Sequence, residues 1–204
     1  MHWVEFDGVR LPQKWGGHVA LDFCNTRAGW GQPAAPGREY LSSYDVLVAW
    51  TRYADLVAPG VARRVTKAAR RDANAARDVL ADARRLRTAV YKAALDPADS
   101  GALAVVNRYA RRASAQMRLR PGVSGPARWE LPPSTGLSWP VLEVARHAAA
   151  LLTSPEVAEV VACPGRGCGW LFLNPHGRRR WCSMQACGNR AKVAAFARRR
   201  SSSG

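Results

Sequence analysis

Four of the five cysteines lie near the C-terminus, where they form two close pairs. Four residues separate the members of each pair and thirteen residues separate the pairs, which consist of Cys163, Cys168, Cys182 and Cys187. A tetrahedral zinc ion takes four thiolates at about 2.3 Å. Two short cysteine turns joined by a connection of hairpin length can bring four sulfurs that close without straining the backbone. The spacing therefore predicts one structural Zn²⁺ ion held by these four residues.

Disulfides, buried apolar cysteines and an iron–sulfur cluster are the alternatives to zinc. Cysteine is otherwise sparse, and the N-terminus MHWVEFDGVR lacks the basic segment and apolar run of a secretory signal. A reducing cytosol, in which disulfides are rare, is therefore the expected setting. The chain has no run of about 18 apolar residues that would span a membrane. We expect a soluble cytoplasmic protein, with an iron–sulfur cluster as the minor competitor of zinc because it also takes four thiolates.

The segment that holds the cysteines is strongly basic. Residues 163–204 contain nine Lys and Arg and no Asp or Glu, and they supply +9 of a net charge of +16. This balance favours a polyanionic partner. Because the segment shows no amphipathic helix with a wide apolar face, we expect nucleic acid rather than a membrane. The residues assigned to nucleic-acid contact are Arg178, Arg179, Arg180, Arg190, Lys192, Arg198, Arg199 and Arg200.

The sequence predicts two domains, a mainly helical α+β domain over residues 1–154 and a small zinc finger over residues 160–204. Apolar periodicity and stop signals predict helices over about 42–54 and 66–95, a third from Asp99 or Ser100, and a fourth from Pro140 to Leu152. Ser42 is the expected cap of the first helix. Leu103, Val106 and Ala110 are the expected apolar stripe of the third.

Two further patterns qualify this helical domain. Alternating apolar residues at 117–119 and 129–131, on either side of a Pro/Gly/Ser turn at 121–126, predict a short β-hairpin. The arginines of the 66–95 helix alternate with Asp72, Asp78 and Asp82 at helical spacings. This mixture favours a solvated face of mixed charge over a nucleic-acid contact.

The stretch HVALDFCNT, from His18 to Thr26, is too short for an independent helix, and it either opens a helix or forms a buried strand. Polar side chains in it form a candidate ligand pocket, whose residues are His18, Asp22, Asn25 and Thr26. The alternative is that these side chains cap the neighbouring backbone or begin a turn. Cys24 has no nearby partner in the sequence and is interpreted as a buried apolar residue.

The finger itself is predicted to have a treble-clef-like plan. A strand over 169–173 and a turn over 174–177 lead into a returning strand over 178–181. Ser183 then caps a helix that contains Cys187 and whose first turn supplies the second ligand pair. About forty residues are too few to bury a self-sufficient core, so we expect this module to need its metal to fold.

The chain resembles the CGNR zinc-finger family, whose motif stands here as Cys187-Gly188-Asn189-Arg190. The resemblance extends over 168–172, 179–184 and 191–192. The N-terminal part is similar to the ABATE domain that commonly precedes this finger, through the stretches LDFCNT at 21–26, Leu86-Arg87, Leu103 with Asn107, and 149–152. This implies a bacterial, stress-induced transcription regulator with a zinc finger that binds DNA and an N-terminal α/β domain that senses a signal. The family usually has an Asp where this chain has Asn174, so the role of that Asp is not carried over.

We therefore interpret the chain as a DNA-binding transcription regulator without enzymatic activity, whose N-terminal domain responds to a small-molecule effector or sets a homodimer. An RNA-binding module is the first alternative, and it would stack unpaired bases on exposed aromatic residues such as Trp170 or Trp181. An enzyme with a site around His18, Asp22 and Asn25 is the second. It is less favoured because four thiolates close a zinc site to substrate.

Overall fold

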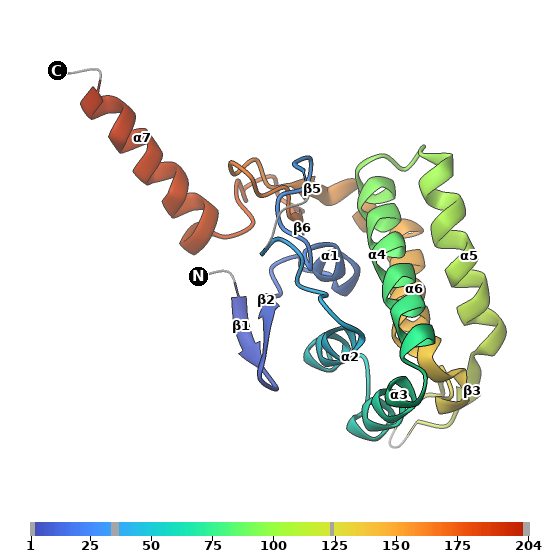
Figure 1. Cartoon of the computed structure of the whole chain (residues 1–204). Helices are drawn as coiled ribbons and strands as arrows, with labels where there is room; N and C mark the ends of the chain where they lie inside the picture. Colours follow the sequence, from blue (N-terminus) through green and yellow to red (C-terminus); the bar gives the residue numbers. More distant parts are fainter. Residues whose placement is uncertain (1–2, 34–36, 123–124, 202–204) are drawn as a thin grey trace.

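The computed structural model describes residues 3–33, 37–122 and 125–201. In these residues the chain is mainly helical, with short antiparallel strand pairs (Figure 1). The predicted fold class is thereby confirmed. The α-helices are α1 (Val19–Cys24), α2 (Tyr44–Tyr53), α3 (Pro59–Arg71), α4 (Ala73–Leu95), α5 (Ser100–Gln116), α6 (Trp139–Leu152) and α7 (Asn189–Ser201). The strands are β1 (Trp3–Phe6), β2 (Val9–Pro12), β3 (Arg118–Arg120), β4 (Arg128–Glu130), β5 (Val160–Ala162) and β6 (Leu171–Leu173).

Helices α4, α5 and α6 form the main helical layer, and α1 packs against α4 and α6 (Figure 1). Its core is aliphatic, with Leu86 and Val90 of α4 and Leu142 and Ala145 of α6 fully buried. The 310-helix η1 (Pro133–Ser138) leads into α6, and a second 310-helix, η2 (Pro155–Glu159), follows it. Among the described helices, none combines the length and the apolar composition that crossing a bilayer requires.

The single helix predicted over 66–95 is wrong, because the structure divides this segment into α3 and α4 at Asp72. Asp72 has φ −137°, and its side chain accepts a hydrogen bond from the amide of Ala75, so it ends one helix and caps the next. Pro59 is the first residue of α3, where its missing N–H costs nothing.

Two smaller expectations also change. The cap of α2 is Ser43 rather than Ser42, since the Ser43 side chain accepts from the amide of Val46. In α5 the buried stripe is Ala102, Val106, Tyr109 and Ala113, and the predicted Leu103 is 37% exposed. The helix begins after Asp99 as expected. Val106 is buried as predicted, whereas its neighbours in the stripe are Ala102 and Tyr109 rather than Leu103 and Ala110.

The predicted hairpin at 117–131 forms as β3 and β4, with Leu119 opposite Trp129. Residues 123 and 124 of its turn lie outside the described part of the chain. A second hairpin, β1 with β2, was not predicted from the sequence. The HVALDFCNT stretch is resolved as the short helix α1, which His18 caps by accepting from the amide of Ala20.

In the finger, β6 is formed as predicted but does not pair with residues 178–181. It pairs instead with β5, which precedes the first cysteine, in the register Val160 to Leu173. The predicted returning strand is therefore wrong. Residues 178–181 run as a loop into a π-helical turn, η3 (Met184–Gly188), which continues as α7. Ser183 stands before this turn, but its side chain makes no capping hydrogen bond.

Candidate metal centre

The four predicted ligands converge in the finger. The sulfurs of Cys163, Cys168, Cys182 and Cys187 all lie within 4.8 Å of one another, and all four side chains are buried. The Sγ atoms of Cys168 and Cys182 are 3.7 Å apart, and those of Cys182 and Cys187 are 3.6 Å apart. Four sulfurs at about 2.3 Å from a tetrahedral zinc ion would be about 3.8 Å from one another. The site therefore fits one structural zinc ion.

Each cysteine pair is positioned by the backbone around it. Cys163 and Cys168 lie on the tight turn between β5 and β6, in which the amide of Cys168 donates to the carbonyl of Gly165 at 2.8 Å. A Cβ on Gly165 would lie 2.9 Å from the Sγ of Cys187, so only glycine leaves room for the sulfurs. Cys182 precedes the π-helical turn and Cys187 lies within it, and the backbone amide of Cys182 donates to the Sγ of Cys163 at 3.4 Å.

Arg190 favours the thiolate form of Cys187. Arg190 donates a hydrogen bond to the Sγ of Cys187 at 2.9 Å. Contacts with the other three sulfurs, together with Arg190, lower the pKa of the Cys187 thiol below its usual range. The thiolate is the form of cysteine that ligates zinc. A zinc ion held by four thiolates has no open position for substrate, and its chemistry here is to hold the fold.

The buried cluster around the cysteines contains aromatic side chains from both ends of the chain. Trp170 and Phe172 belong to the finger, whereas Tyr40, Trp15 and Trp30 come from the N-terminal region. The rings of Trp15 and Trp170 meet edge to face at 5.9 Å between centroids. The finger therefore completes its small core with side chains that precede it by more than a hundred residues.

Backbone groups of the first cysteine turn are bonded directly to the N-terminal region. The carbonyl of Cys168 accepts hydrogen bonds from the amides of Gly29 and Trp30 at 3.1 and 3.2 Å. Trp30 stacks on Tyr91 of α4 at 3.9 Å, and the Tyr91 hydroxyl donates to the carbonyl of Gly169 at 2.9 Å. A Cβ on Gly169, whose φ is +69°, would lie 2.7 Å from the Cβ of Trp30. The turn thus requires glycine at this position for both conformation and space.

Asn25, at the end of α1, makes the most specific contact between the two regions. Its side-chain Nδ2 donates to the carbonyl of Leu171 at 2.9 Å, and its Oδ1 accepts from the amide of the same residue at 2.8 Å. Asn25 is fully buried, so it satisfies two backbone groups of β6 that water does not reach.

Arg179 makes a second connection from the finger side. Its guanidinium donates to the carbonyl of Trp15 at 2.6 Å and also to the carbonyl of Cys182, and it lies over the ring of Phe172 at 4.4 Å. An arginine was predicted here for nucleic-acid contact. The structure shows its donors already engaged by backbone carbonyls.

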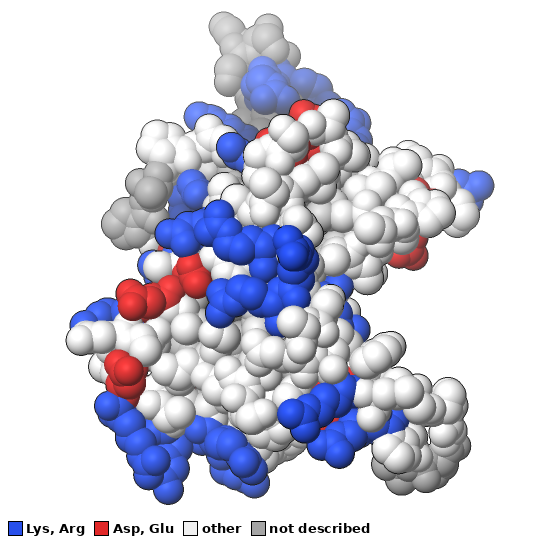
Figure 2. All heavy atoms as spheres, turned by 90° about the vertical axis from the view of Figure 1, so that its right-hand side faces the viewer, with Lys and Arg blue, Asp and Glu red and all other residues white. Residues whose placement is uncertain are grey.

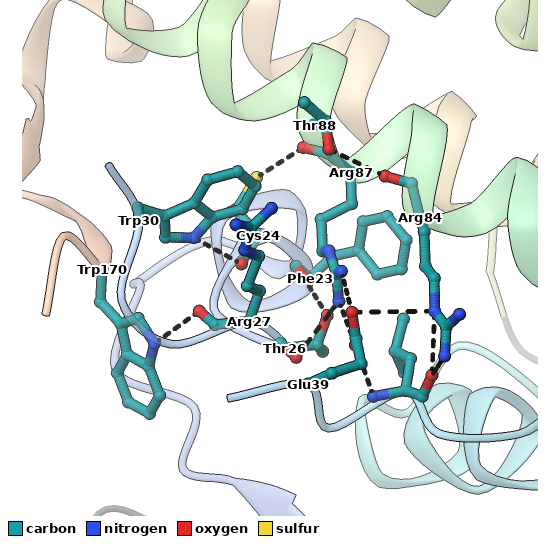
Figure 3. A network of polar contacts seen from close by, with 11 residues as sticks. Phe23, Cys24, Thr26, Arg27, Trp30, Glu39, Arg84, Arg87, Thr88 and Trp170 are labelled. Carbon is teal, nitrogen blue, oxygen red and sulfur yellow. Dashed lines mark hydrogen bonds and ion pairs between the residues drawn. The ribbon is translucent and has the colours of Figure 1, made fainter. Parts of the chain in front are cut away.

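A buried arginine of α4 anchors the segment that follows α1 to the helical layer (Figure 3). Arg87 of α4 is 2% exposed, and its guanidinium forms an ion pair with Glu39 and donates to the hydroxyl of Thr26 at 2.9 Å. Arg84, one turn earlier, donates to the carbonyl of Leu41 at 2.6 Å. The same segment is also bonded to the finger, because Trp170 donates its indole N–H to the carbonyl of Arg27 at 2.9 Å. One polar network therefore runs from α4 through residues 26–27 to the finger.

Comparison with known families agrees with this arrangement. Residues 17–155 match the model of the ABATE family, described as "putative stress-induced transcription regulator". The chain belongs to the ABATE family. Residues 160–200 match the model of the CGNR zinc finger, which confirms the resemblance seen in the sequence and the zinc assignment. No curated protein matches the chain. The first description is of a putative transcription regulator and the second of a zinc finger, and neither names an enzymatic activity.

The four predicted pocket residues lie in or beside α1 of the ABATE region, and each has a protein partner. His18 caps α1, and Asn25 donates to the carbonyl of Leu171. The Thr26 hydroxyl donates to the carbonyl of Phe23 and accepts from Arg87. Asp22 accepts from the amide of Gly16 at 2.8 Å, and burial raises the pKa of its carboxyl to about 6. These contacts match the capping alternative. A ligand pocket at the four residues stays a prediction.

The eight cations predicted to contact nucleic acid fall into two groups. Arg179 and Arg190 belong to the metal centre, as described above. The other side chains lie on the surface of the CGNR finger, in the loop before Trp181 and along α7, at Arg178, Arg180, Lys192, Arg198, Arg199 and Arg200. Arg180 lies over the ring of Trp181 at 5.2 Å. Their contact with nucleic acid stays a prediction.

Several residues of this site were not singled out from the sequence. Glu39, Trp15, Trp30 and Tyr91 are distant from the cysteines in the chain, and nothing in their local pattern indicates a role. Arg87 could have been recognised, because it is an arginine among the apolar residues of a predicted helix and belongs to the ABATE resemblance. Trp170 was predicted as an exposed stacking residue, which is wrong, since it is 2% exposed and packed beside the cysteines.

Proposed function

We propose that this ABATE-family regulator binds duplex DNA through its CGNR finger, and that α7 and the loop at 178–180 supply the contacts. The observation that carries this proposal is α7 itself. The helix has no Asp or Glu, extends away from the rest of the molecule, and exposes most of its side chains (Figure 1). An α-helix has the width to enter the major groove of B-DNA.

The exposure of α7 also argues for a partner. Helices in proteins gain most of their stability by packing an apolar face, and an isolated helix of this length is marginal in water. Here Val193 and Phe196 remain 70% and 56% exposed. A nucleic-acid surface would neutralise the cations and shield these side chains. The first turn of α7 is already held by the metal centre, which fixes the direction in which the helix leaves the molecule.

The metal centre would then position cations rather than react. Zinc, once bound, supplies a fixed link between the two cysteine turns and no chemistry of its own. Arg179 orients the loop by donating to Trp15 and Cys182, which leaves its neighbours Arg178 and Arg180 exposed beside it. Each phosphate contact made by such a side chain releases counterions, so binding should weaken steeply as salt rises.

The ABATE region is proposed to control the finger, either by sensing a small-molecule effector or by setting a homodimer. Support comes from the junction, because Asn25, Trp30 and Tyr91 hold the backbone of the first cysteine turn and of β6. A rearrangement of α1 would change these contacts directly. We further propose a cytoplasmic location, which suits the five described cysteines because none of them forms a disulfide.

The test is a salt titration of duplex DNA binding by the full-length, zinc-loaded chain. The variant R178Q/R180Q/K192Q removes three exposed finger charges, and R108Q/R111Q/R112Q removes three from α5 as a control of equal charge. If the three finger residues contact phosphates, the slope of log K against log salt should fall by about 3 in the finger variant. The control should keep the wild-type slope. Binding that ignores salt, or equal losses in both variants, would contradict the proposal.

The RNA alternative receives no comparable support. Trp170 is buried, and Trp181 is partly buried beneath Arg180, so the finger offers little open aromatic surface for stacking. Competition by single-stranded RNA against duplex DNA at matched salt distinguishes the two. Stronger competition by RNA than by unlabelled duplex would favour the alternative.

A further inference from the structure

Helix α3 carries a concentration of positive charge that is separate from the mixed charge of α4. Between Pro59 and Arg71 there are five cations and no Asp or Glu. All five are exposed, while Ala62, Val65 and Ala69 turn inward to the core. The cations are Arg63, Arg64, Lys67, Arg70 and Arg71. The mixed charge that favoured a solvated face belongs to α4, beyond the break at Asp72.

The arginines of α4 differ from those of α3 in their partners. Arg85 pairs with Asp82 at 2.7 Å, Arg77 donates to Asn74, and Arg87 is paired with Glu39. Within residues 3–33, 37–122 and 125–201, none of the five α3 cations makes an ion pair or a side-chain hydrogen bond. Their charge is therefore unbalanced within the described chain.

This arrangement opposes the stability of the helix. Lys67 stands three or four residues from Arg63, Arg64, Arg70 and Arg71. Like charges at these spacings destabilise a helix by about 0.2–0.5 kcal/mol per pair. The helix start gives no compensation, because Ala58 offers no side-chain cap and the first turn has no acidic residue. A polyanion bound along α3 would relieve this repulsion.

The surroundings of α3 are concave as well as basic. A groove of about 760 Å³ beside α2 is lined by Arg52, Arg63, Lys67 and Arg70, and a second groove of about 550 Å³ beside α4 is lined by Arg70, Arg77 and Arg84. The acidic side chains that line them are Asp7, which is paired with Arg52, and Asp45. At the lower end of the molecule, where Figure 1 places α3, Lys and Arg outnumber Asp and Glu (Figure 2). The cations outnumber these carboxylates in each groove, and a cleft with such an excess of positive charge attracts anions.

We infer that α3 is a second DNA-contact surface, at which its exposed cations bind the phosphate backbone of the duplex that the finger holds. This inference rests on the proposed function for the identity of the polyanion. From residue 63 to residue 71 the helix axis runs about 12 Å, which faces about three phosphates of one strand at about 3.4 Å per phosphate along the duplex axis. The contact carries no base recognition, because it uses charge alone.

The placement of α3 predicts a dependence on DNA length. Figure 1 shows α3 and α7 at opposite ends of the molecule. A duplex of about 10 base pairs, about 34 Å long, should be bound by the finger alone, whereas one of about 40 base pairs should reach both surfaces. The α3 contacts should therefore strengthen binding to the long duplex and leave the short one unchanged.

The experiment measures binding of the full-length, zinc-loaded chain to both duplexes over a salt series. In R63Q/K67Q/R70Q, the slope of log K against log salt should fall by about 3 on the long duplex, at about 0.9 for each phosphate contact. The slope on the short duplex should not change. R108Q/R111Q/R112Q, which removes the same charge from α5, should behave as wild type on both. The inference would be overturned if R178Q/R180Q/K192Q lost long-duplex binding and R63Q/K67Q/R70Q did not, or if the α3 and α5 variants lost binding equally. Either result would leave the proposed function intact.

A failure of the wild-type chain to bind either duplex would instead sink the proposed function, and this inference with it. Thermal unfolding without DNA adds a readout that binding does not affect. R63Q/K67Q/R70Q should unfold at the wild-type temperature or slightly higher, since the substitutions remove like-charge repulsion and glutamine has a helix propensity close to that of arginine and lysine. A clear fall in Tm would show that the fold itself uses these charges, and would contradict the inference.

Discussion

The two buried clusters of the molecule differ in the types of residue that form them. The larger one, in the helical region, is mainly aliphatic, with aromatic residues such as Phe23, Trp50 and Tyr109 among them, and it brings together helices α1 to α6. The smaller one, in the finger, consists of four cysteines and aromatic rings, several of them supplied by the N-terminal region. Apolar burial at about 25 cal/mol per Å² is sufficient to hold a domain of the larger size. The smaller cluster depends on its metal and on its neighbour.

Between the clusters lies a polar junction, made of Asn25, Arg87, Glu39 and the backbone that they hold. It joins a region that is stable through packing to one that is stable through coordination. The following predictions test how far the two regions are independent, beginning with the largest expected effect.

Removal of zinc should separate the regions most strongly. Structural zinc contributes on the order of 10 kcal/mol or more to a small finger, so a chelator or Cys182→Ser should unfold residues 160–201. Tryptophan fluorescence should report this change, because Trp170 becomes exposed. Far-UV circular dichroism should keep most of its helical signal, since α1–α6 contain none of the ligands. Loss of both signals in one transition would show that the regions form one cooperative unit.

Arg87→Met should produce the next largest effect. Breaking a buried ion pair by removing one partner costs about 3–5 kcal/mol. Glu39 is 33% exposed, so the cost here should lie at the lower end of that range, and the substitution also releases Thr26. The expected result is a lower midpoint in urea unfolding, with loss of the junction. Arg85→Met is the matched control from the same helix, and its more exposed pair with Asp82 is expected to contribute little to stability. Equal effects of the two substitutions would refute the anchoring role of Arg87.

Asn25→Ala should loosen the finger while leaving the helical cluster in place. The substitution strands the buried N–H and C=O of Leu171, each at a cost of about 1–3 kcal/mol. Hydrogen exchange should accelerate at the amides of β6 more than at those of α4. Thr51→Val removes a buried hydroxyl that donates to the carbonyl of Val48 within the same helix, and it is expected to cost less than Asn25→Ala. Uniform acceleration across α4 and β6 would argue against a local effect.

Asp22→Asn should have the smallest effect and the opposite sign. Burial raises the pKa of Asp22 from 3.8 to about 6 in the folded chain. The folded state then binds the proton more tightly than the unfolded state, so stability falls as pH rises from about 4 to 6, by up to about 3 kcal/mol. An asparagine accepts the same bond from Gly16 and carries no charge. The variant should be more stable than wild type above pH 6 and should not share the decline between pH 4 and 6, as measured by chemical unfolding across this range.

The two regions differ in how much of their structure could be predicted from the sequence. The four ligands were predictable because the coordination chemistry of zinc fixes both residue type and spacing, whatever surrounds them. The helices were predictable where apolar periodicity was long, as in α2, α4 and α6. The division at Asp72 was missed because the apolar pattern continues through it, and only the geometry of the cap reveals the break. The pairing of β6 with β5 was missed because two three-residue strands carry little pattern of their own.

By itself, the sequence determined what the finger is made of: four thiolates, an excess of positive charge, and motifs that resemble a regulator family. Only the tertiary structure decided which charges remain available. Arg179 and Arg190 are engaged at the metal centre, Arg87 is buried in an ion pair, and the cations of α3 have no ion-pair or hydrogen-bond partner among the residues that the structure describes. The physical reason is that coordination and helix periodicity are local in the chain, whereas the partner of a charged side chain is set by residues far away in sequence that folding brings within reach.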